Sequence, residues 1–302
     1  MSLSYFVVDI FADRAFDGAP MTVIVDDQQL SDFQMVTIAQ ENPLTQTVFV
    51  QTSQSMQKKA KVFSLQGEVP LTTHCVMAAA QVLANECNNQ IPNDGKIRFA
   101  DSEGVEFETH VLMQNGESLV TIAQTVRSIE NRAIPTIKQI ADVLHLIPAD
   151  IGFEKFEPMI VDAQGPYLIV PIKSYNAVRA ARVNQDLWIQ SSLTSSLVKG
   201  VFLFSNNTDS NTADFHSRIV SPEFSNNFDP PTGSVIPSFA AYLCHFDTVQ
   251  EGTHSFEVQR GATNARQSHI HVEMDNKKQS ELNVRIAGGA VTAIRGKIMI
   301  PR

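Results

Sequence analysis

The sequence has few cysteines, no long apolar run and no basic cluster, and each absence excludes a class of protein. Its 302 residues include only Cys75, Cys87 and Cys244, an odd and widely spaced set that does not suggest a disulfide framework or a zinc site. No apolar stretch approaches the roughly 20 residues that a membrane-spanning helix needs. The N-terminus lacks the basic segment of a secretory signal. We therefore expect a reducing, cytoplasmic location.

Positive charge is also scarce. Lysine and arginine number 23 against 32 acidic residues, which gives a formal net charge of −9. Because affinity for nucleic acids and for anionic membranes depends on clustered cations, we expect neither partner. Hydrophobic residues make up 43 % of the chain, an ordinary globular share. At roughly 100–200 residues per domain, the length favours two domains.

The order of predicted elements repeats after about half the chain. Two strands, a turn with proline and an almost wholly apolar helix occur from Val48 to Leu83 and again from Val201 to Leu243. A helix that is apolar on most sides is buried on most sides. The repeat predicts an internal duplication and an α+β fold. Each of its two similar lobes is a curled, barrel-like sheet around a buried central helix. The first lobe comprises residues 1–126 with 286–302, and the second comprises residues 127–285.

Local signals predict further elements. Ser31 is a typical N-cap for a helix over 32–40, and a second amphipathic helix is expected from Thr136 to Leu144. A helix is also expected near Leu187 to Leu193. Towards the C-terminus, the pattern predicts a strand, a turn at Gly288-Gly289 and further β-structure.

Chemistry is expected where the two buried helices begin, because a helix N-terminus presents unpaired N–H groups and the positive end of the helix dipole. If the two lobes face each other, both helix starts reach one interlobe cleft, which suits an anion such as a carboxylate. The polar residues at these starts are Thr72, Thr73 and His74 on one side and Asp229, Thr232, Gly233 and Ser234 on the other. His74 and Asp229 occupy matching places, whereas the hydroxyl groups also suit helix caps.

Five short motifs occur in a characteristic order along nearly the whole chain. They are Asp9-Ile10-Phe11 with Phe16 to Pro20, Ile38 to Val50, Glu68 to His74, Asp229 to Ser234, and Gly288 to Val291. In this order they resemble D-x-F with G-N-P, I-A-x-E-x-N-x-S-E-T-x-F-V, E-x-P-F-A-G-H, D-P-A-T-G-S and G-G-x-x-V. These are motifs of the phenazine-biosynthesis (PhzF-like) isomerase family, which shares the diaminopimelate epimerase-like fold. The most specific match is the fourth.

The resemblance implies a homodimer that needs no cofactor and moves a proton on a small carboxylate-bearing, amino-acid-like metabolite. It implies catalytic roles for His74 and Asp229. It also implies that Gly233 and Ser234 bind substrate through backbone or hydroxyl donors.

The chain departs from the family pattern at three places. Where the family has its catalytic glutamate after a serine, this chain has Thr45 and Gln46. An amide cannot take up or release a proton near neutral pH, so we expect Gln46 to orient substrate. Ala19 replaces the family's asparagine, and Thr73 replaces its glycine before the histidine. Thr45, Thr73 and Ala19 are therefore expected to line the substrate site.

Two classes of function stay open on the sequence alone. The first is an isomerase in which Asp229 and His74 carry out the proton transfer. The alternative is a pseudo-enzyme that binds a small metabolite without converting it, or a dimeric scaffold of the same fold. No metal is expected, because His269 and His271 alternate on a predicted strand without an evident third ligand. A two-thiol epimerase is not expected, because Cys75 has no counterpart at the second helix start.

Overall fold

The computed structural model divides into two compact units, which we describe separately. It describes residues 1–301 except 43–45, 53–56, 88–91, 93, 115–116, 128–131, 164, 211, 225–228, 247–248, 263–264 and 278–280. Unit 1 comprises residues 1–123, 265–268 and 287–302, and unit 2 comprises residues 124–264 and 269–286. Residues 265–268, which the predicted boundaries give to the second lobe, cluster with unit 1.

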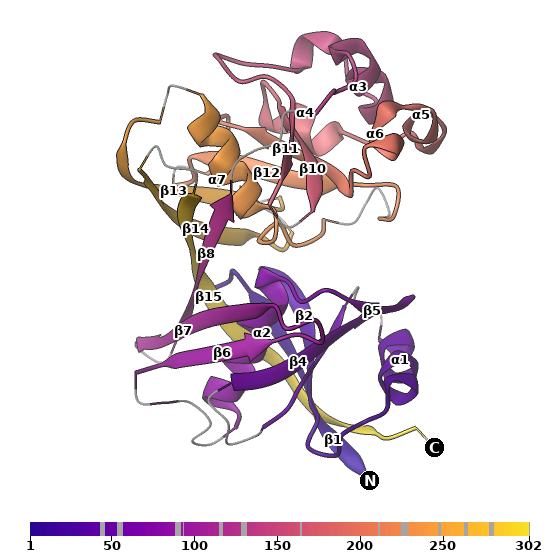
Figure 1. The fold of residues 1–302 in the computed structure, drawn as a ribbon, viewed down its shortest axis with the longest axis vertical. Coiled ribbons are helices and arrows are strands. Elements are labelled where there is room, and N and C mark those ends of the chain that lie inside the picture. Colours follow the sequence, from indigo (N-terminus) through magenta and orange to yellow (C-terminus); the bar gives the residue numbers. More distant parts are fainter. Residues whose placement is uncertain are drawn as a thin grey trace. The chain divides into compact units, whose positions relative to one another are not determined.

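Unit 1 is built on a curled sheet. Its elements are β1 (Ser2–Ile10), β2 (Ala19–Val25), α1 (Asp32–Glu41), β3 (Thr47–Val50), β4 (Gln57–Ser64), β5 (Gly67–Val69), α2 (Thr73–Asn85), β6 (Lys96–Ala100), β7 (Glu106–Gln114) and the first part of β8 (Glu117–Arg127) (Figure 1). The strand order is β1-β2-β3-β4-β6-β7-β8, and β5 pairs with β4. The last strand, β15 (Glu281–Met299), neighbours β8 and also pairs with β1, so the strand order closes on itself.

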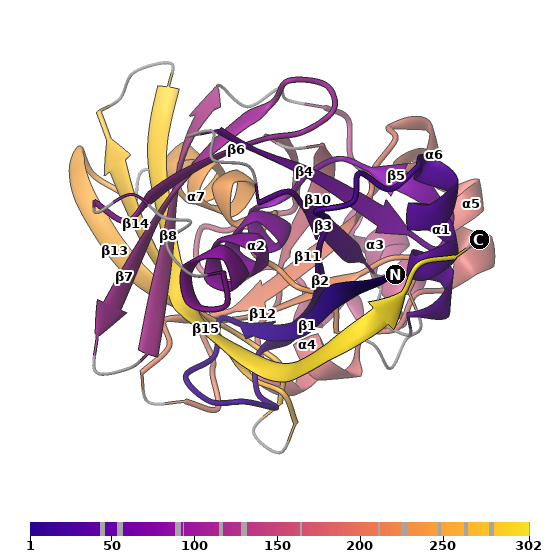
Figure 2. The same cartoon turned by 90° about the horizontal axis from the view of Figure 1, so that it is seen from below.

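Helix α2 is the centre of unit 1. It packs against β1, β2, β3, β4 and β7, and Figure 2 shows strands around it. Every residue from Thr73 to Leu83 is buried. This stretch contains no Asp, Glu, Lys or Arg, so no side of the helix carries a group that demands water. The buried central helix predicted for the first lobe is confirmed.

Helix α1 covers the outer face of the same sheet. Its start is the predicted one, because the Ser31 hydroxyl accepts from the Gln34 backbone N–H at 3.3 Å and the Gln34 side chain accepts from the Ser31 N–H at 3.1 Å. Met35 and Ile38 of α1 belong to the same core cluster as Phe49, on β3. The helix is therefore fixed by its cap at one end and by apolar packing along one side.

Unit 2 repeats the arrangement. Its elements are α3 (Ile137–Leu144), a 3-10 turn η1 (Pro148–Asp150), β9 (Met159–Asp162), β10 (Pro166–Pro171), α4 (Tyr175–Ala180), α5 (Gln185–Gln190), α6 (Ser192–Ser195), β11 (Gly200–Ser205), β12 (Phe215–Val220), α7 (Ile236–His245), β13 (Gly252–Arg260) and β14 (Ser268–Asn276). The strand order is β9-β10-β11-β12-β13-β14-β15. Pairs β9/β10 and β11/β12 are antiparallel, whereas β10/β11 and β12/β13 are parallel.

The same alternation runs through β1/β2, β2/β3, β3/β4 and β4/β6 of unit 1. The predicted duplication is therefore visible in the pairing pattern. In unit 2, strand β11 is covered on both faces: Phe202 and Phe204 contact Phe239 of α7, while Val201 and Leu203 lie in the cluster formed with α3 and α5. Because β11 is buried on both faces, its central residues Val201 to Phe204 are all apolar.

The predicted turn at Gly288-Gly289 is wrong, because β15 passes through both glycines without a break. Gly289 has another reason to be glycine. Its carbonyl accepts from the Ala12 N–H at 3.1 Å, and a Cβ atom on Gly289 would lie 2.4 Å from the Ala12 carbonyl oxygen. The residue allows two backbones to approach closely rather than the chain to turn.

The helix predicted near Leu187 to Leu193 is present, but it is divided into the two short helices α5 and α6. Ser191 ends α5 and begins α6, and its hydroxyl accepts from the Leu193 N–H at 3.3 Å. The same hydroxyl donates to the Trp188 carbonyl at 2.7 Å. Serine competes well for backbone groups in this way and so interrupts a helix that the apolar spacing alone favours.

Candidate active site

In unit 1, the start of α2 brings together two of the predicted site residues. His74 Nε2 lies 2.9 Å from Gln46 Oε1, and the Cys75 thiol donates to the same oxygen at 3.2 Å. Thr72 is the N-cap residue, but its side chain makes no cap hydrogen bond. Its hydroxyl oxygen lies 3.1 Å from His74 Nε2 and 3.3 Å from Nδ1, and the hydroxyl donates to the Cys75 sulfur at 3.2 Å.

These groups are uncharged at neutral pH. Burial lowers the pKa of His74 to about 4 and raises the pKa of Cys75 to about 12. A neutral imidazole carries one N–H, and an amide oxygen can only accept. Nε2 therefore donates to Gln46, and Nδ1 keeps its lone pair. Gln46 thus fixes the tautomer of His74.

The other predicted residues of unit 1 lie at element starts. Thr73 is the first residue of α2 and is fully buried. Ala19 is the first residue of β2, also buried, and is paired with Ile10. Gly18 before it has φ +63°, and a Cβ there would meet the Ile10 carbonyl oxygen at 2.3 Å, so the chain needs glycine at this bend. Thr45 lies outside the described residues.

The bend before Ala19 is held by a segment distant in sequence. Asp9, fully buried on β1, accepts from Arg266 Nη1 at 2.5 Å and from the Phe16 N–H at 2.6 Å. Asp17 Oδ1 accepts from the Gln267 N–H at 2.5 Å. These contacts lie within unit 1 and explain why residues 265–268 cluster with it.

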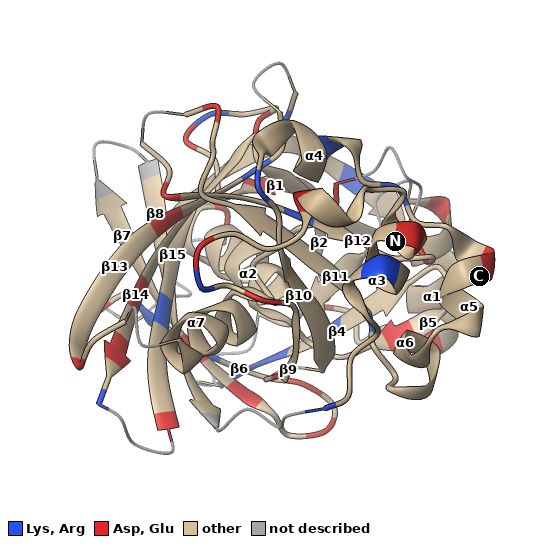
Figure 3. Ribbon diagram, turned by 90° about the horizontal axis from the view of Figure 1, so that it is seen from above, with Lys and Arg blue, Asp and Glu red and all other residues tan. Residues whose placement is uncertain are grey.

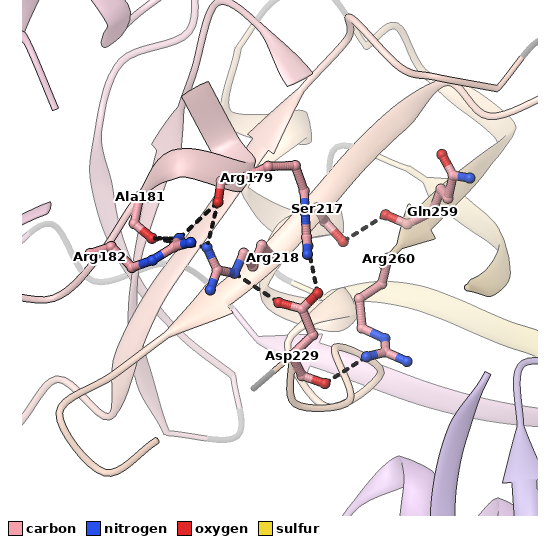
Figure 4. Close-up of polar contacts among 8 residues, drawn as sticks. All are labelled: Arg179, Ala181, Arg182, Ser217, Arg218, Asp229, Gln259 and Arg260. Carbon is pink, nitrogen blue, oxygen red and sulfur yellow. Dashed lines mark hydrogen bonds and ion pairs between the residues drawn. The ribbon is translucent and has the colours of Figure 1, made fainter. Parts of the chain in front are cut away.

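In unit 2, Asp229 lies among arginines from three elements (Figure 4). Arg179 of α4 donates through Nη1 to Oδ2 at 2.5 Å, and Arg218 of β12 donates through Nε to Oδ1 at 2.7 Å. Arg260 of β13 donates to the Asp229 backbone carbonyl at 2.5 Å. Both carboxylate oxygens therefore already accept a charged hydrogen bond.

The electrostatics keep Asp229 ionised. Burial by itself would raise the pKa of this carboxyl, but the positive charges of Arg179, Arg218 and Arg260 outweigh that effect and hold the pKa below its ordinary value. At neutral pH the group is a carboxylate, and it is a weak base because two guanidinium groups stabilise its charged form.

The start of α7 parallels that of α2. Gly233 and Ser234 form the turn before it, and the N-cap residue Val235 offers no side-chain cap. Thr232 Oγ1 is buried and has no hydrogen-bond partner among the described residues. The Ser234 side chain is hydrogen-bonded to the Tyr167 hydroxyl. Each central helix therefore begins without a side-chain cap, as an anion-binding N-terminus would.

Sequence reasoning missed the arginines. Arg218 and Arg260 lie on strands and are buried, although arginine is seldom buried without a partner. An arginine between Ser217 and Ile219, inside the strand Phe215–Val220, was the available signal. Arg179, at the C-terminal end of α4, gave none. Lysine and arginine are spread over several helices and strands (blue in Figure 3), so one arginine at a helix end does not stand out.

The two alternating histidines, His269 and His271, both lie near the Glu257 carboxylate. His269 Nδ1 and His271 Nδ1 lie 3.9 and 3.5 Å from the Glu257 carboxylate oxygens. No group of three or more His, Cys, Asp or Glu in the described part of the chain is arranged to hold a metal ion. None of the helices found there has the length and apolar character to cross a membrane.

The fold is shared with proteins of known structure. A phenazine biosynthesis protein of the PhzF family from Bacillus anthracis superposes with a TM-score of 0.86 at 18 % identity, covering 99 % of this chain and 100 % of the other. A hydroxyproline epimerase from Agrobacterium vitis superposes with a TM-score of 0.60 at 10 % identity, covering 98 % and 91 %. The fold is therefore the diaminopimelate epimerase-like one.

The sequence narrows this class to one family. Residues 8–296 match the family model described as PhzC-PhzF, phenazine biosynthesis-like protein, and the chain belongs to that family. An uncharacterized isomerase of Mesorhizobium japonicum is 26 % identical over 310 residues, with 98 % of this chain and 99 % of the relative covered. The trans-2,3-dihydro-3-hydroxyanthranilate isomerase of Pseudomonas chlororaphis is 23 % identical over 298 residues, with 98 % and 99 % covered.

Proposed function

We propose that this chain is a cofactor-independent isomerase that moves a proton on a small carboxylate-bearing metabolite. Family membership supports the reaction class, since relatives over the full length are named isomerases. The observation that carries the proposal is the state of His74. It is a buried, neutral imidazole, its tautomer is fixed by Gln46, and it stands at the uncapped start of a buried helix.

In the proposed reaction, His74 is the base. Its Nδ1 lone pair takes a proton from a substrate carbon in conjugation with the carboxylate, and the electron pair of the broken C–H bond delocalises towards that carboxylate. The N-terminus of α2 favours the negative charge that develops. The imidazolium then returns the proton to another carbon of the conjugated system. A new C–H bond forms there, and the imidazole becomes neutral again.

Because its pKa is low, His74 is a strong enough base only when substrate is bound. A substrate anion beside the imidazole favours its protonated form and raises the pKa from about 4. Gln46 transfers no proton. It holds Nε2 through Oε1, and its amide N–H groups are proposed to orient the substrate. In unit 1, Thr45, Thr73 and Ala19 are proposed to line the site around His74. In unit 2, Gly233 and Ser234 are proposed to bind substrate at the start of α7, with Asp229 as a carboxylate.

Deuterium incorporation from D2O, followed by NMR over a panel of small hydroxy, amino and unsaturated acids, tests the reaction. The wild type should exchange a carbon-bound proton of at least one panel acid. His74→Gln should slow that exchange by about 100-fold or more, the usual contribution of a general base. The matched control is His110→Gln, which removes an exposed imidazole of the same unit. Undiminished exchange in His74→Gln would disprove the assignment.

A second function, binding without conversion, is favoured by one observation. Gln46, His74 and Cys75 are all uncharged at neutral pH, so none of them is an acid or base poised near that pH. A panel acid that protects the wild type against thermal unfolding, and is recovered unlabelled after long incubation in D2O, would establish this alternative. The family-based expectation of a homodimer remains a prediction, which sedimentation of the full chain would test.

A further inference from the structure

A cavity lies in unit 1 on the face of the sheet that α1 covers. Its volume is about 330 Å³, within the roughly 300–1,000 Å³ of pockets that bind small molecules. The lining residues are Asp26, Gln29, Leu30, Met35, Phe49, Gln51, Lys59 and Lys61. None of them is among the predicted site residues, so the cavity is separate from the site at the start of α2.

The sheet face beneath α1 changes from apolar to polar at this cavity. Phe49 of β3 lies in the core cluster that also holds the apolar side of α1. Two positions further along, Gln51 lies between Asp26 and Lys59. The Asp26 N–H donates to the Val50 carbonyl at 2.8 Å, and the Gln51 N–H donates to the Lys59 carbonyl at 3.1 Å, which continues the pairing of β3 with β2 and β4. Asp26, Gln51 and Lys59 therefore form one row across three neighbouring strands, which we call the polar row.

At one end of the polar row, Asp26 is a buried carboxylate without a cation. It is only 1 % exposed. Oδ1 accepts from the N–H groups of Gln28 and Leu30 at 3.2 and 3.1 Å, and Oδ2 accepts from the Leu30 N–H at 3.1 Å. Among the described residues, no Lys, Arg or His forms an ion pair with it. Aspartate is seldom buried without a partner of opposite charge, and Oδ2 has a lone pair left for one.

At the other end of the polar row, Lys59 is an exposed cation without an acid. Its ammonium group has no hydrogen bond or ion pair in the part of the chain that the structure describes. Lys61, the second lysine of the cavity, is already neutralised, because it donates to Asp32 at 2.7 Å and lies 3.9 Å from Glu68. An unpaired surface lysine is ordinary by itself. Lys59 differs because it shares a row with a buried, unpaired acid.

The distance between the two charges suits an α-amino acid. Neighbouring strands lie about 4.8 Å apart, so the backbones of Asp26 and Lys59 are about 10 Å apart across Gln51. An α-amino acid that makes one charged hydrogen bond at each end spans roughly 8–9 Å from acid oxygen to ammonium nitrogen. The two side chains can therefore bind the two ends of one such molecule.

The remaining lining residues suit the rest of that molecule. Leu30, Met35 and Phe49 offer an apolar surface, and all three belong to the core cluster beneath α1. The side-chain amides of Gln29 and Gln51 make no hydrogen bond within the described residues, so they can donate to a carboxylate. The cavity thus combines an acid, a cation, two amides and an apolar surface.

We propose that this cavity binds a free α-amino acid with an apolar side chain. The ammonium group of the ligand donates to Asp26 Oδ2, its carboxylate accepts from the Lys59 ammonium group, and its side chain packs on the apolar surface. An acid without an amino group leaves Asp26 without a cation, and an amine without a carboxylate leaves Lys59 without an acid. The zwitterion is therefore preferred to either. This site is additional to the isomerase proposed above and does not depend on it.

Isothermal titration calorimetry with matched ligands tests the proposal without requiring turnover. The probes are L-leucine, 4-methylpentanoate, which lacks the ammonium group, 3-methylbutylamine, which lacks the carboxylate, and L-alanine, which lacks most of the side chain. Leucine should bind the wild type about tenfold or more tightly than each of the other three. The two charge deletions each remove a charged hydrogen bond, and alanine loses apolar burial.

Two substitutions should act on different probes. Lys59→Gln should weaken leucine and 4-methylpentanoate by about tenfold and leave 3-methylbutylamine unchanged. Asp26→Asn should weaken leucine and 3-methylbutylamine and leave 4-methylpentanoate unchanged, because it removes the charge but keeps an acceptor for the loop N–H groups. Lys96→Gln, which removes a lysine of the same unit that is 55 % exposed, is the matched charge control and should bind as the wild type does. Thermal unfolding of each variant checks the fold, and if Asp26→Asn does not fold, Lys59→Gln alone decides.

Three results would each overturn the proposal. They are no binding of leucine to the wild type, equal binding of leucine and its two charge-deleted analogues, and leucine binding that is unaffected by Lys59→Gln. His74→Gln gives the location, since it should leave leucine binding unchanged; a loss there would assign leucine to the start of α2 instead. Leucine binding without any deuterium exchange would leave this proposal standing and remove only the isomerase.

Discussion

Replacing Gln46 with glutamate should turn His74 into a group that titrates near neutral pH. The new carboxylate would take the place of an amide oxygen that lies 2.9 Å from Nε2. With charge centres about 4 Å apart and an effective dielectric constant of about 20, the attraction is about 4 kcal/mol, or about 3 pKa units. The pKa of His74, about 4 in the wild type, should therefore rise to about 6–7.

The same change should alter how stability depends on pH. In the wild type the pKa of folded His74, about 4, lies below the unfolded value of about 6.5, so the unfolded chain binds the proton more tightly. The contribution of His74 to stability is complete above about pH 6.5 and is lost as the pH falls towards 4, by about 3 kcal/mol. In Gln46→Glu the pKa values of His74 in the folded and unfolded chains nearly coincide, so this loss of stability at low pH should disappear.

NMR titration of the histidine imidazoles gives the pKa of His74 directly, with His74→Gln used for assignment. Urea unfolding at about pH 7 and about pH 4.5 gives the second quantity. His216, whose pKa is also about 4, contributes equally to both proteins and cancels in the difference. Gln46→Met is the uncharged control and should leave the pKa of His74 near 4. A His74 pKa that stays near 4 in Gln46→Glu would refute the pairing on which the proposed chemistry depends.

Two further substitutions test packing within unit 1. Gly289→Ala should lower the free energy of unfolding by about 2 kcal/mol, because its Cβ would meet the Ala12 carbonyl oxygen at 2.4 Å. Gly296→Ala, whose Cβ has its nearest neighbour at 3.8 Å, should change it little, and equal values in urea unfolding would contradict the close-approach explanation. Asp9→Ala should cost about 3 kcal/mol, because it removes the partner of Arg266; a loss under about 1 kcal/mol in the same assay would show that the pair does not hold the Ala19 bend.

Elements with a strong local cause were predictable from the sequence. The strand Lys96–Ala100 and the helix from Asp32, with its Ser31 cap, follow from alternation and from capping chemistry. The two central helices were predictable because a segment without charged residues has to be buried. The errors came where a local signal had two explanations, as at Gly289, where glycine serves a close approach between strands rather than a turn.

The candidate site was predictable only in part, because some of its contacts join residues that are far apart in the sequence. His74 and Asp229 lie in short motifs at predicted helix starts, so the local sequence is enough to identify them as candidate site residues. Arg179 and Asp229 are 50 positions apart, and their contact depends on how α4 packs on β12. No spacing rule covers such a pair. The sequence therefore suggested a proton-transferring Asp229, whereas the structure shows a carboxylate whose two oxygens are bound by guanidinium groups.

These contacts make the proposed chemistry conditional on its ligand. Burial leaves His74 too weak a base to be protonated near pH 7, and the arginines keep Asp229 from being protonated there. An acid–base reaction at neutral pH then requires a charge that the chain itself does not supply. A substrate carboxylate is such a charge, because it raises the pKa of the imidazole that it approaches. The neutral methyl esters of the acids that exchange deuterium should accordingly be neither bound nor exchanged, and an ester that exchanges as fast as its acid would show that the base is competent without the substrate's charge.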